Sequence, residues 1–315
     1  MTALLTMDQR ALAGQLTMTT LFIGLGRMGG PMVRRYAPMH ATVLYDVNRD
    51  VATAIAMDLE TQAVESLNEI PSNINTVLLM LPNSRIVESV IEGQRGLLTR
   101  LPKGALVIDM GSSEPASTRR LAQEAANRGI SYVDAPVSGG VAKAITGELS
   151  IMVGGTSADI ERAMEHLAPL GTQIFSVGAA GTGHAAKALN NLLSATNLAA
   201  AAEVLAVAKS IGIEASVMVN VINASTGRSQ ATEVKYPKHV LTGTFDSGFA
   251  MDLMLKDLII AHAMSDGEGL TTPITDETVD TFREAYSSLD GANFDHTEIA
   301  RFYEVINHVE FRYSE

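Results

Sequence analysis

Short apolar runs alternate with helical patterns over the first half of the chain. The runs that indicate strands are Leu21–Ile23, Thr42–Tyr45, Val77–Leu81, Ala105–Asp109, Ser131–Asp134, Ser150–Val153 and Gln173–Ser176. Helical patterns and short polar turns lie between them, as at Val51–Leu59. This alternation is typical of an α/β fold with a parallel, doubly wound sheet.

The pattern changes after GAAGTG at 178–183. Strand signals nearly vanish, and His184–Ile211 reads as one long apolar helix that ends before Gly212. Further helical patterns follow at Ser216–Ala224, Phe249–Ser265, Thr275–Ser288 and Asp295–Asn307. We therefore predict an α/β domain over residues 18–180, a long connecting helix, and an all-helical domain over 181–315.

Residues 1–17 do not resemble a targeting segment. They carry Asp8 and Arg10 and lack a long apolar core, so we expect a mobile extension rather than a signal peptide. Translation from Met18 is an alternative. The apolar stretch Leu198–Ala208 is interrupted by Glu203 and is too short to span a membrane. We expect a cytoplasmic protein.

Composition narrows the function classes. With 46% hydrophobic residues among 315, the chain can bury a large core. A net charge of −12 argues against nucleic acid or an anionic membrane as the partner. The chain has no cysteine, which excludes disulfides, thiolate metal sites and cysteine nucleophiles.

The loop after the first predicted strand carries a G-x-G-x-x-G motif. Gly24, Gly26 and Gly29 follow Leu21–Ile23 and open a helical pattern. In this context the glycines allow a tight turn, close approach to a pyrophosphate, and packing of helix on strand. The sequence therefore predicts a Rossmann-type dinucleotide site whose loop residues are Gly24, Leu25, Gly26, Arg27, Met28 and Gly29.

The cofactor is expected to be NAD. Asp46 ends the second predicted strand, 22 residues after Gly24, where a carboxylate can accept hydrogen bonds from ribose hydroxyls. A carboxylate there repels the 2′-phosphate of NADP. Arg49 is either a surface charge or a partner for that phosphate, and so NADP stays an alternative.

A polar stripe runs along the long apolar helix. Lys187, Asn190, Asn191 and Ser194 are spaced i, i+3, i+4 and i+7, which places them on one face. A buried lysine near a carbonyl or hydroxyl can serve as general acid or base, because burial brings an ammonium pKa toward neutrality. The alternative is a lysine that extends to solvent while the asparagines cap nearby loops.

Five segments together resemble the β-hydroxyacid dehydrogenase family. They are FIGLGRMGGPM (Phe22–Met32), LLMLPNS (Leu78–Ser84), DAPVSGGVAKAITGELSIMVGG (Asp134–Gly155), GTGHAAKALNN (Gly181–Asn191) and FAMDLMLKDL (Phe249–Leu258). They occur in the family's order and span nearly the whole chain after residue 18. The resemblance implies hydride transfer between a nicotinamide and a small β-hydroxy acid or its semialdehyde.

The resemblance also implies individual roles. Lys187 takes the position of the family's catalytic general acid/base, and Asn191 that of its partner. The other implied contacts are Ser138, Gly139, Gly140 and Asn190 for the substrate, and Leu81, Pro82, Ser112 and Lys256 for the cofactor. A serine hydroxyl followed by successive backbone N–H groups makes a small nest for a carboxylate. Without the resemblance, Lys256–Asp257 reads as a solvated helix face.

Three positions depart from the family pattern. Gly111 replaces a common serine, which we expect to loosen its loop, and Lys143 replaces a common glycine. Lys143 favours the tartronate semialdehyde reductases within the family. Ser194 stands where 6-phosphogluconate dehydrogenases carry a glutamate that donates a proton after decarboxylation, which favours simple hydride transfer here.

The reading that follows is an NAD-dependent dehydrogenase of a 3-hydroxyisobutyrate-like acid. Alternatives are a tartronate semialdehyde or succinic semialdehyde/glyoxylate reductase and, more remotely, a non-catalytic dinucleotide-binding protein. The seven histidines form no metal-binding spacing, so no metal is expected. The apolar C-terminal helices, some rich in methionine, favour a homo-oligomer, a dimer or tetramer.

Overall fold

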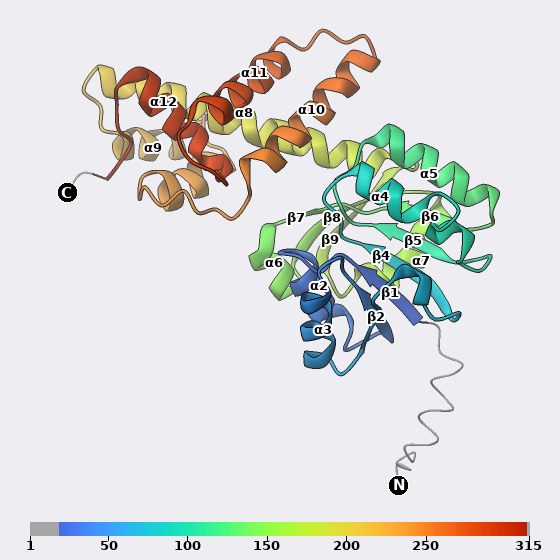
Figure 1. Ribbon diagram of the computed structural model, residues 1–315. Coiled ribbons are helices and arrows are strands. Elements are labelled where there is room, and N and C mark those ends of the chain that lie inside the picture. The colour runs from blue at the N-terminus through green and yellow to red at the C-terminus, as the bar shows by residue number, and fades with distance from the viewer. Residues whose placement is uncertain (1–18, 314–315) are drawn as a thin grey trace. The chain divides into compact units, whose positions relative to one another are not determined.

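The computed structural model describes residues 19–313, so the predicted extension at 1–17 lies outside the described residues. The chain divides into two compact units, of which the first ends at Lys187 and the second begins at Ala188. The first is an α/β unit built on a twisted sheet, and the second is helical (Figure 1).

The first unit contains the strands of the described chain. They are β1 (Thr19–Ile23), β2 (Thr42–Tyr45), β3 (Gln62–Ala63), β4 (Ile74–Leu79), β5 (Leu106–Asp109), β6 (Ser131–Asp134), β7 (Val137–Ser138), β8 (Leu149–Gly154) and β9 (Gly171–Gly178). The sheet order is β3-β2-β1-β4-β5-β6-β8-β7, and β9 pairs with β8. The order reverses on either side of β1 and β4, as a doubly wound sheet requires.

Most neighbouring strands are parallel, as the alternating pattern predicts. The register of β1 places Phe22 opposite Leu44 of β2 and Leu78 of β4. The exception is β8, which runs antiparallel to β6 and β7 and parallel to β9. The two-residue strands β3 and β7 are too short to give a periodic signal, and sequence reasoning missed them.

Helices cover both faces of this sheet. They are α2 (Gly29–Tyr36), α3 (Arg49–Asp58), α4 (Ser84–Ile91), α5 (Pro115–Asn127), α6 (Gly140–Thr146) and α7 (Ser157–Leu167), with short 3₁₀ turns η1 (Leu67–Glu69) and η2 (Leu97–Thr99). Phe22 and Leu78 pack in one core with α2, α3, α6 and α7, while Leu21 and Val77 pack in the other with α4 and α5. Alternate strand residues thus bury opposite faces.

The second unit is built around the long helix. Its elements are the part of α8 (Thr182–Ser210) that follows Lys187, α9 (Ala215–Asn223), the π-helix η3 (Ala231–Val240), α10 (Met251–Gly267), α11 (Pro273–Ser288), the 3₁₀ turn η4 (His296–Glu298) and α12 (Ile299–Asn307). Leu198, Tyr236 and Phe282 are fully buried in one core that joins α8 to η3 and α11. The expected helices are confirmed, and η3 was missed.

A proline accounts for the unusual form of η3. Pro237 lies inside η3 and has no N–H, so it cannot complete the hydrogen bonds of an ordinary α-helix there.

Among the described residues, α8 is the one helix long and apolar enough to cross a membrane. Half of its most apolar window is buried within the protein, as in core helices of globular folds.

Candidate active site

The loop between β1 and α2 has the geometry that its glycines predict. A Cβ on Gly24 would lie 2.3 Å from the carbonyl oxygen of Met80, and one on Gly29 would lie 1.8 Å from that of Gly24. Gly24 also has a φ of +92°. A Cβ on Gly26 would meet nothing within 4 Å. Two glycines therefore permit the turn and its packing, while the third leaves open space beside the loop.

That open space fits a dinucleotide pyrophosphate. No described side chain caps the N-terminus of α2, and its first turn carries no acidic residue. A helix N-terminus of this kind favours a phosphate, because its backbone N–H groups and dipole both face the anion. Gly26 and Arg27 are exposed beside it, and Met28 is half-buried. These residues can hold the phosphates of a nicotinamide dinucleotide.

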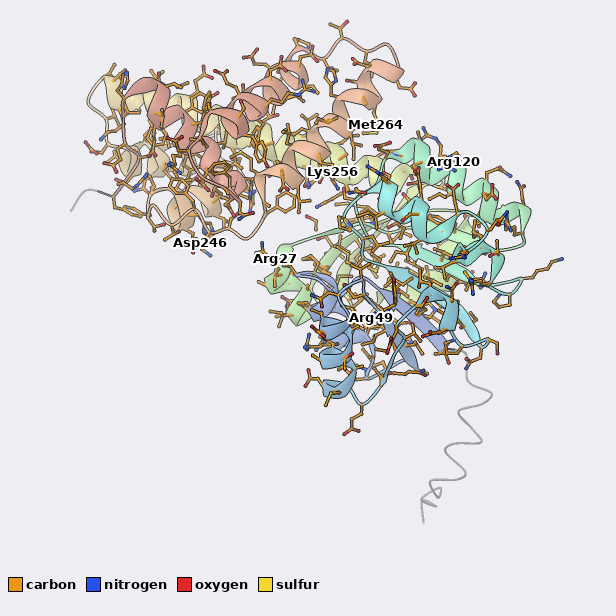
Figure 2. The ribbon with its side chains drawn as sticks, viewed as in Figure 1. Arg27, Arg49, Arg120, Asp246, Lys256 and Met264 are labelled. Carbon is orange, nitrogen blue, oxygen red and sulfur yellow. The ribbon has the colours of Figure 1, made fainter. Side chains whose placement is uncertain are left out.

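Asp46 ties the end of β2 to the same loop. Its carboxylate accepts hydrogen bonds from the backbone N–H of Leu25 at 2.7 Å and that of Asn48 at 2.8 Å. A carboxylate has about four acceptor sites, so it can still accept ribose hydroxyls. Arg49, on α3 (Figure 2), instead forms an exposed ion pair with Glu65 at 2.7 Å.

The loops that follow β4 and β5 pack against each other. A Cβ on Gly111 would lie 2.6 Å from the carbonyl oxygen of Leu81, so a glycine permits this approach. The Gly111 N–H donates to Asp109 Oδ1 at 3.0 Å. The expectation that Gly111 loosens its loop is therefore wrong. The loop is held, with Ser112 half-buried beside it and Pro82 exposed on its neighbour.

The Ser138–Gly140 loop connects β7 to α6. Gly139 and Gly140 have φ values of +130° and +71°, a conformation that side-chain-bearing residues rarely adopt. Ser138 is half-buried, and the two glycines are exposed. A Cβ on Gly139 would lie 2.6 Å from Cδ of Lys143, so the stem of this lysine covers the loop.

Asp134, at the end of β6, anchors the beginning of α8. Its carboxylate accepts from the Gly181 N–H at 2.8 Å and the His184 N–H at 2.9 Å, and it is fully buried. Burial raises the pKa of the Asp134 carboxyl, while His184 and the two backbone donors act to lower it. A Cβ on Gly154 or Gly183 would come within 2.8 Å of this carboxylate, so both glycines permit the contact.

Asp109 and Asp134 converge on one histidine. His184 Nδ1 forms a 2.7 Å hydrogen bond with Thr118 Oγ1, and its ring nitrogens lie 3.8 Å from Asp109 and 3.9 Å from Asp134. Asp109 also accepts hydrogen bonds from Ser113 and Tyr132. These aspartates, which are far apart in the sequence, thus meet in a solvent-excluded cluster at the start of α8.

Lys187 follows one turn after this anchor. The residue is only 9% exposed, which argues against the alternative of a lysine that extends to solvent. Asn191 is buried one turn further along α8. Asn190 is exposed and donates from Nδ2 to Asn191 Oδ1 at 3.3 Å.

In the second unit, Asp257 of α10 orients Asn191. Asn191 Nδ2 donates to Asp257 Oδ2 at 2.6 Å, and Lys256 Nζ lies 3.3 Å from Asp257 Oδ1. Because the Asn191 amide nitrogen faces Asp257, its oxygen is left to accept from other donors. Asp257 is 1% exposed, so the reading of Lys256–Asp257 as a solvated face is wrong for Asp257. Lys256 is partly exposed (Figure 2).

Sequence reasoning missed Asp257 and Asp134 as supports of the site. Asp257 sits four residues after Leu253 and three after Met254 on an apolar helix, and that spacing alone marks it as unusual. Asp134 is the last residue of a buried strand and precedes a proline-containing turn. Over the described residues, no three His, Asp or Glu side chains gather closely enough to hold a metal ion.

Two family models match consecutive parts of the chain. The NAD-binding domain of 6-phosphogluconate dehydrogenase matches residues 19–178. The NAD-binding domain of NADP-dependent 3-hydroxyisobutyrate dehydrogenase matches residues 181–303. The two matches meet at the glycine-rich connector before α8.

Individual relatives cover most of the chain. A 2-(hydroxymethyl)glutarate dehydrogenase of Eubacterium barkeri is 39% identical over 258 residues, which are 81% of this chain and 84% of the relative. The human mitochondrial 3-hydroxyisobutyrate dehydrogenase is 34% identical over 76% of this chain and 74% of its own. A Mycobacterium tuberculosis 3-hydroxyisobutyrate dehydrogenase solved with L-serine has a TM-score of 0.83 and 29% identity, covering 91% of this chain and 99% of the other.

The anchor of α8 gives a direct test. Asp134→Asn replaces one acceptor oxygen with an NH₂ group that faces a backbone N–H, so one buried donor loses its partner. We expect this to lower the free energy of unfolding by about 1–3 kcal/mol. Amide hydrogen exchange should quicken at the first turn of α8. Thermal melts and exchange mass spectrometry measure the two effects, with Asp58→Asn on the exposed surface as control. Unchanged exchange in α8 would contradict the anchoring role.

Proposed function

The chain belongs to the β-hydroxyacid dehydrogenase family, and we propose that it oxidises the primary alcohol of an acid of the form HOCH₂–CHR–COO⁻. The enzyme is an NAD(P)-dependent dehydrogenase of hydroxy acids. The observation that carries the proposal is the buried Lys187, one helical turn after an anchored helix start and one turn before the oriented Asn191.

The names of the relatives support this substrate form. 3-Hydroxyisobutyrate, 2-(hydroxymethyl)glutarate and L-serine share a hydroxymethyl group on the carbon next to the carboxylate. They differ only in R, which is a methyl, a carboxyethyl or an amino group. A site that binds the shared carboxylate and hydroxyl would process any of them, and the surroundings of R would set the choice.

The roles of the residues follow from this shared unit. Ser138, Gly139 and Gly140 would hold the carboxylate, because their loop presents a hydroxyl and backbone N–H groups. Lys187 would take the proton of the hydroxyl during oxidation and return it during reduction. Asn191, held by Asp257, would fix the hydroxyl toward the lysine. The nicotinamide, when bound at the Gly24–Gly29 loop, supplies the hydride acceptor.

One observation favours a second candidate substrate. The stem of Lys143 lies over Gly139, in the loop proposed to hold the carboxylate. This supports tartronate semialdehyde, whose reduction gives an acid of the shared form in which R is a hydroxyl group.

A non-catalytic dinucleotide-binding role would not require both a buried lysine and an oriented asparagine. Turnover of a panel of these acids, followed by nicotinamide absorbance, tests the proposal.

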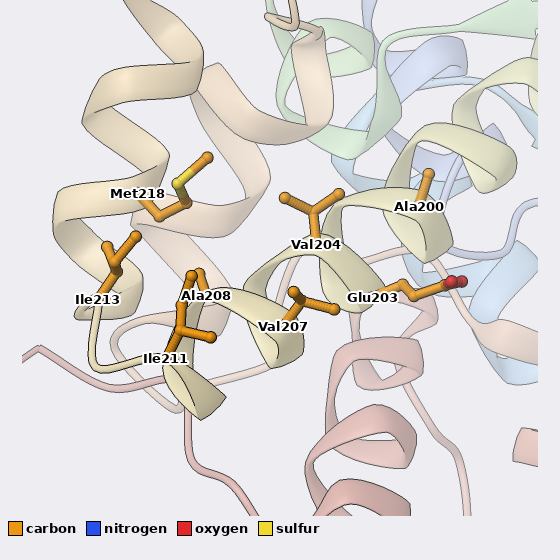
Figure 3. A pocket seen from close by; sticks show the side chains of 8 residues that line it. All are labelled: Ala200, Glu203, Val204, Val207, Ala208, Ile211, Ile213 and Met218. Atoms are coloured by element: carbon orange, nitrogen blue, oxygen red, sulfur yellow. The ribbon is translucent and has the colours of Figure 1, made fainter.

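We also propose that the protein assembles as a dimer or tetramer through its second unit. A shallow groove on α8 and α9 is lined almost entirely by apolar side chains (Figure 3): Ala200, Glu203, Val204, Val207, Ala208, Ile211, Ile213 and Met218. Val207 is 59% exposed and Ile211 is 70% exposed. Contiguous exposed apolar surface of this kind typically marks an interface between subunits.

The first prediction for this function concerns cofactor choice. We expect a higher kcat/KM with NAD than with NADP, because Asp46 repels a 2′-phosphate and Arg49 pairs with Glu65. Asp46→Ala should lower kcat/KM more with NAD than with NADP. It should lower kcat/KM somewhat with both cofactors, because the Leu25 N–H in the phosphate loop loses its acceptor. Asp50→Ala on the exposed turn of α3 is the control. A wild-type preference for NADP would refute the assignment and point to Arg49.

The second prediction concerns Lys187. Lys187→Ala should lower kcat by about 10²–10⁴, the usual contribution of acid–base catalysis. Lys187→Arg should rescue poorly, because a guanidinium does not release its proton near neutral pH. In the wild type, kcat/KM for oxidation should fall at low pH as the catalytic base is protonated, and this limb of the pH profile should disappear in the alanine variant. The cofactor Kd should change little, since the phosphate loop is untouched.

A matched control for this experiment is Lys209→Ala. Lys209 lies on the same helix and forms a surface ion pair with Glu214 at 2.9 Å, so it should leave kcat unchanged. If Lys187→Ala keeps a normal kcat while the melting temperature falls, Lys187 is a structural residue.

The third prediction concerns assembly. Light scattering at micromolar concentration should give the mass of a dimer or tetramer. Ile211→Glu should shift the mass toward the monomer, because it places a charge in the apolar groove. Met57→Glu alters an isolated exposed apolar residue on α3 and should leave the mass unchanged. A monomeric wild type would rule out the proposed assembly.

A further inference from the structure

The histidine at the start of α8 has one buried ring nitrogen without a hydrogen bond. His184 is 1% exposed. Its Nε2 has no hydrogen-bond partner among the residues that the structure describes, and it lies 3.8 Å from Asp109 Oδ2. A buried polar atom in this condition is rare, because it loses its contact with water and gains nothing in exchange. The protonation state of the ring therefore needs to be derived from its surroundings.

The other ring nitrogen of His184 carries a proton. Nδ1 lies 2.7 Å from Thr118 Oγ1. The single hydroxyl proton of Thr118 is donated to the carbonyl oxygen of Glu114 at 3.2 Å, so toward His184 the hydroxyl can only accept. The proton between His184 and Thr118 is thus on Nδ1.

Asp109, which faces Nε2, is a carboxylate. Its Oδ1 accepts from the Gly111 N–H at 3.0 Å, and its Oδ2 accepts from the hydroxyls of Ser113 and Tyr132 at 3.2 Å each. Burial, reinforced by Asp109, raises the pKa of the Tyr132 hydroxyl well above its ordinary range, so Tyr132 remains a donor. Because donors face both of its oxygens, Asp109 carries no proton of its own.

The contact between His184 and Asp109 therefore requires a proton on Nε2. A bare Nε2 would set a lone pair against a carboxylate in a solvent-excluded cluster, whereas a protonated Nε2 makes the contact an ion pair. Asp134 provides a second anion, with Oδ2 3.9 Å from Nδ1, and both of its oxygens accept backbone N–H groups. Two buried carboxylates beside one ring favour the imidazolium.

The charge on this ring lies close to the proposed base. The charged groups around the ring are Asp109 of β5, Asp134 of β6 and, one turn along α8, Lys187. The spacing of His184 and Lys187 is i, i+3, which puts their Cβ atoms about 5–6 Å apart on one face. Arg119 of α5 has its stem against the connector before α8 but is exposed, so water and salt screen its charge.

We propose that His184 is a positioning residue that acts through Lys187: its imidazolium, held by Asp109 and Asp134, favours release of the Lys187 proton. The inference rests on the proposed function of Lys187 as a base. Two buried carboxylates alone would hold Lys187 as an ammonium, which cannot accept a proton from the substrate. The imidazolium offsets one of them and repels a second positive charge on the same helix face. His184 needs no contact with substrate or cofactor for this effect.

The alternative for His184 is a structural role as a neutral imidazole that joins α8 to α5. In that case its replacement by another neutral donor would change stability and leave the ionisation of Lys187 as it is. A charged His184 predicts a shift in that ionisation. The two roles are therefore separated by a pH titration and not by activity alone.

The first experiment reads the charge of the ring directly. In protein labelled with ¹⁵N-histidine, the His184 signals are assigned by their loss in His184→Asn. Both ring nitrogens should show N–H signals at pH 7 in the wild type. Asp109→Asn removes the facing carboxylate and should leave Nε2 without its proton.

The second experiment reads the effect on Lys187. His184→Gln keeps a donor toward Asp109 and His184→Asn keeps one toward Thr118, and both remove the positive charge. The low-pH limb of kcat/KM for oxidation should move to higher pH by about 1–2 units in both variants, as expected for one charge at about 7 Å in a protein interior. The value of kcat above that limb should stay within about 3-fold of the wild type.

A titration that requires no turnover accompanies the kinetics. In protein labelled with ¹³C-lysine, the Lys187 signal is assigned by its loss in Lys187→Ala, and its midpoint should move by the same amount as the kinetic limb. The control is His308→Asn. His308 is exposed, and its φ of +52° is one that asparagine accommodates, so this variant should move neither midpoint.

Each negative result has its own meaning. A bare Nε2 in the wild type would overturn the charge on His184. A charged ring together with an unmoved Lys187 midpoint in both neutral variants would overturn its effect on the base and make His184 structural. A wild type that turns over no hydroxy acid, while the Lys187 midpoint still moves, would refute the proposed function and leave the electrostatic coupling standing.

Discussion

The buried carboxylate of Asp134 is the contact on which the geometry of the site depends. It accepts the backbone N–H groups of Gly181 and His184 and thereby fixes the first turn of α8 to the end of β6. Without a partner, these donors would remain buried and unsatisfied, at about 1–3 kcal/mol each. Because a helix is rigid over a few turns, fixing its first turn fixes the direction in which Lys187 leaves it.

The other carboxylates around the site act in the same way. Asp46 holds the N–H of Leu25 in the phosphate loop, Asp109 holds that of Gly111, and Asp257 holds the amide of Asn191. None of these aspartates needs to exchange a proton for the proposed reaction. An acidic chain with a net charge of −12 can therefore serve an anionic substrate. Several of its carboxylates are used to orient donors, such as the N–H groups of Leu25 and Gly111.

The fold could be predicted because its signals are local. Apolar runs of strand length, the G-x-G-x-x-G turn and one long apolar helix each depend on neighbours within a few residues. The antiparallel position of β8 and the π-helix η3 could not be predicted in this way. The first depends on pairing between distant strands, and the second on a proline that packing holds inside a helix.

The residues of the candidate site can likewise be separated into those with local sequence signals and those that depend on distant contacts. Lys187, Asn191 and the phosphate loop lie in contiguous motifs, so the sequence predicts them as candidates together with the type of reaction that they would support. Their supports come from distant segments: Asp134 lies 50 residues from His184, and Asp257 lies 66 residues from Asn191. Sequence spacing carries no information about such contacts, although a lone aspartate on an apolar helix, such as Asp257, signals that one exists.

Some contacts in the second unit are still more dispersed along the sequence. Lys235 meets Ser194 across 41 residues and His296 across 61, and Phe249 contacts the same histidine. The residues that act on the shared HOCH₂–CH–COO⁻ unit can therefore stay the same while those around R change independently. A hydrophobic surrounding would favour a methyl group only weakly, by about 1–3 kcal/mol per methylene, whereas a buried polar group that a substrate leaves unpaired penalises that substrate more strongly.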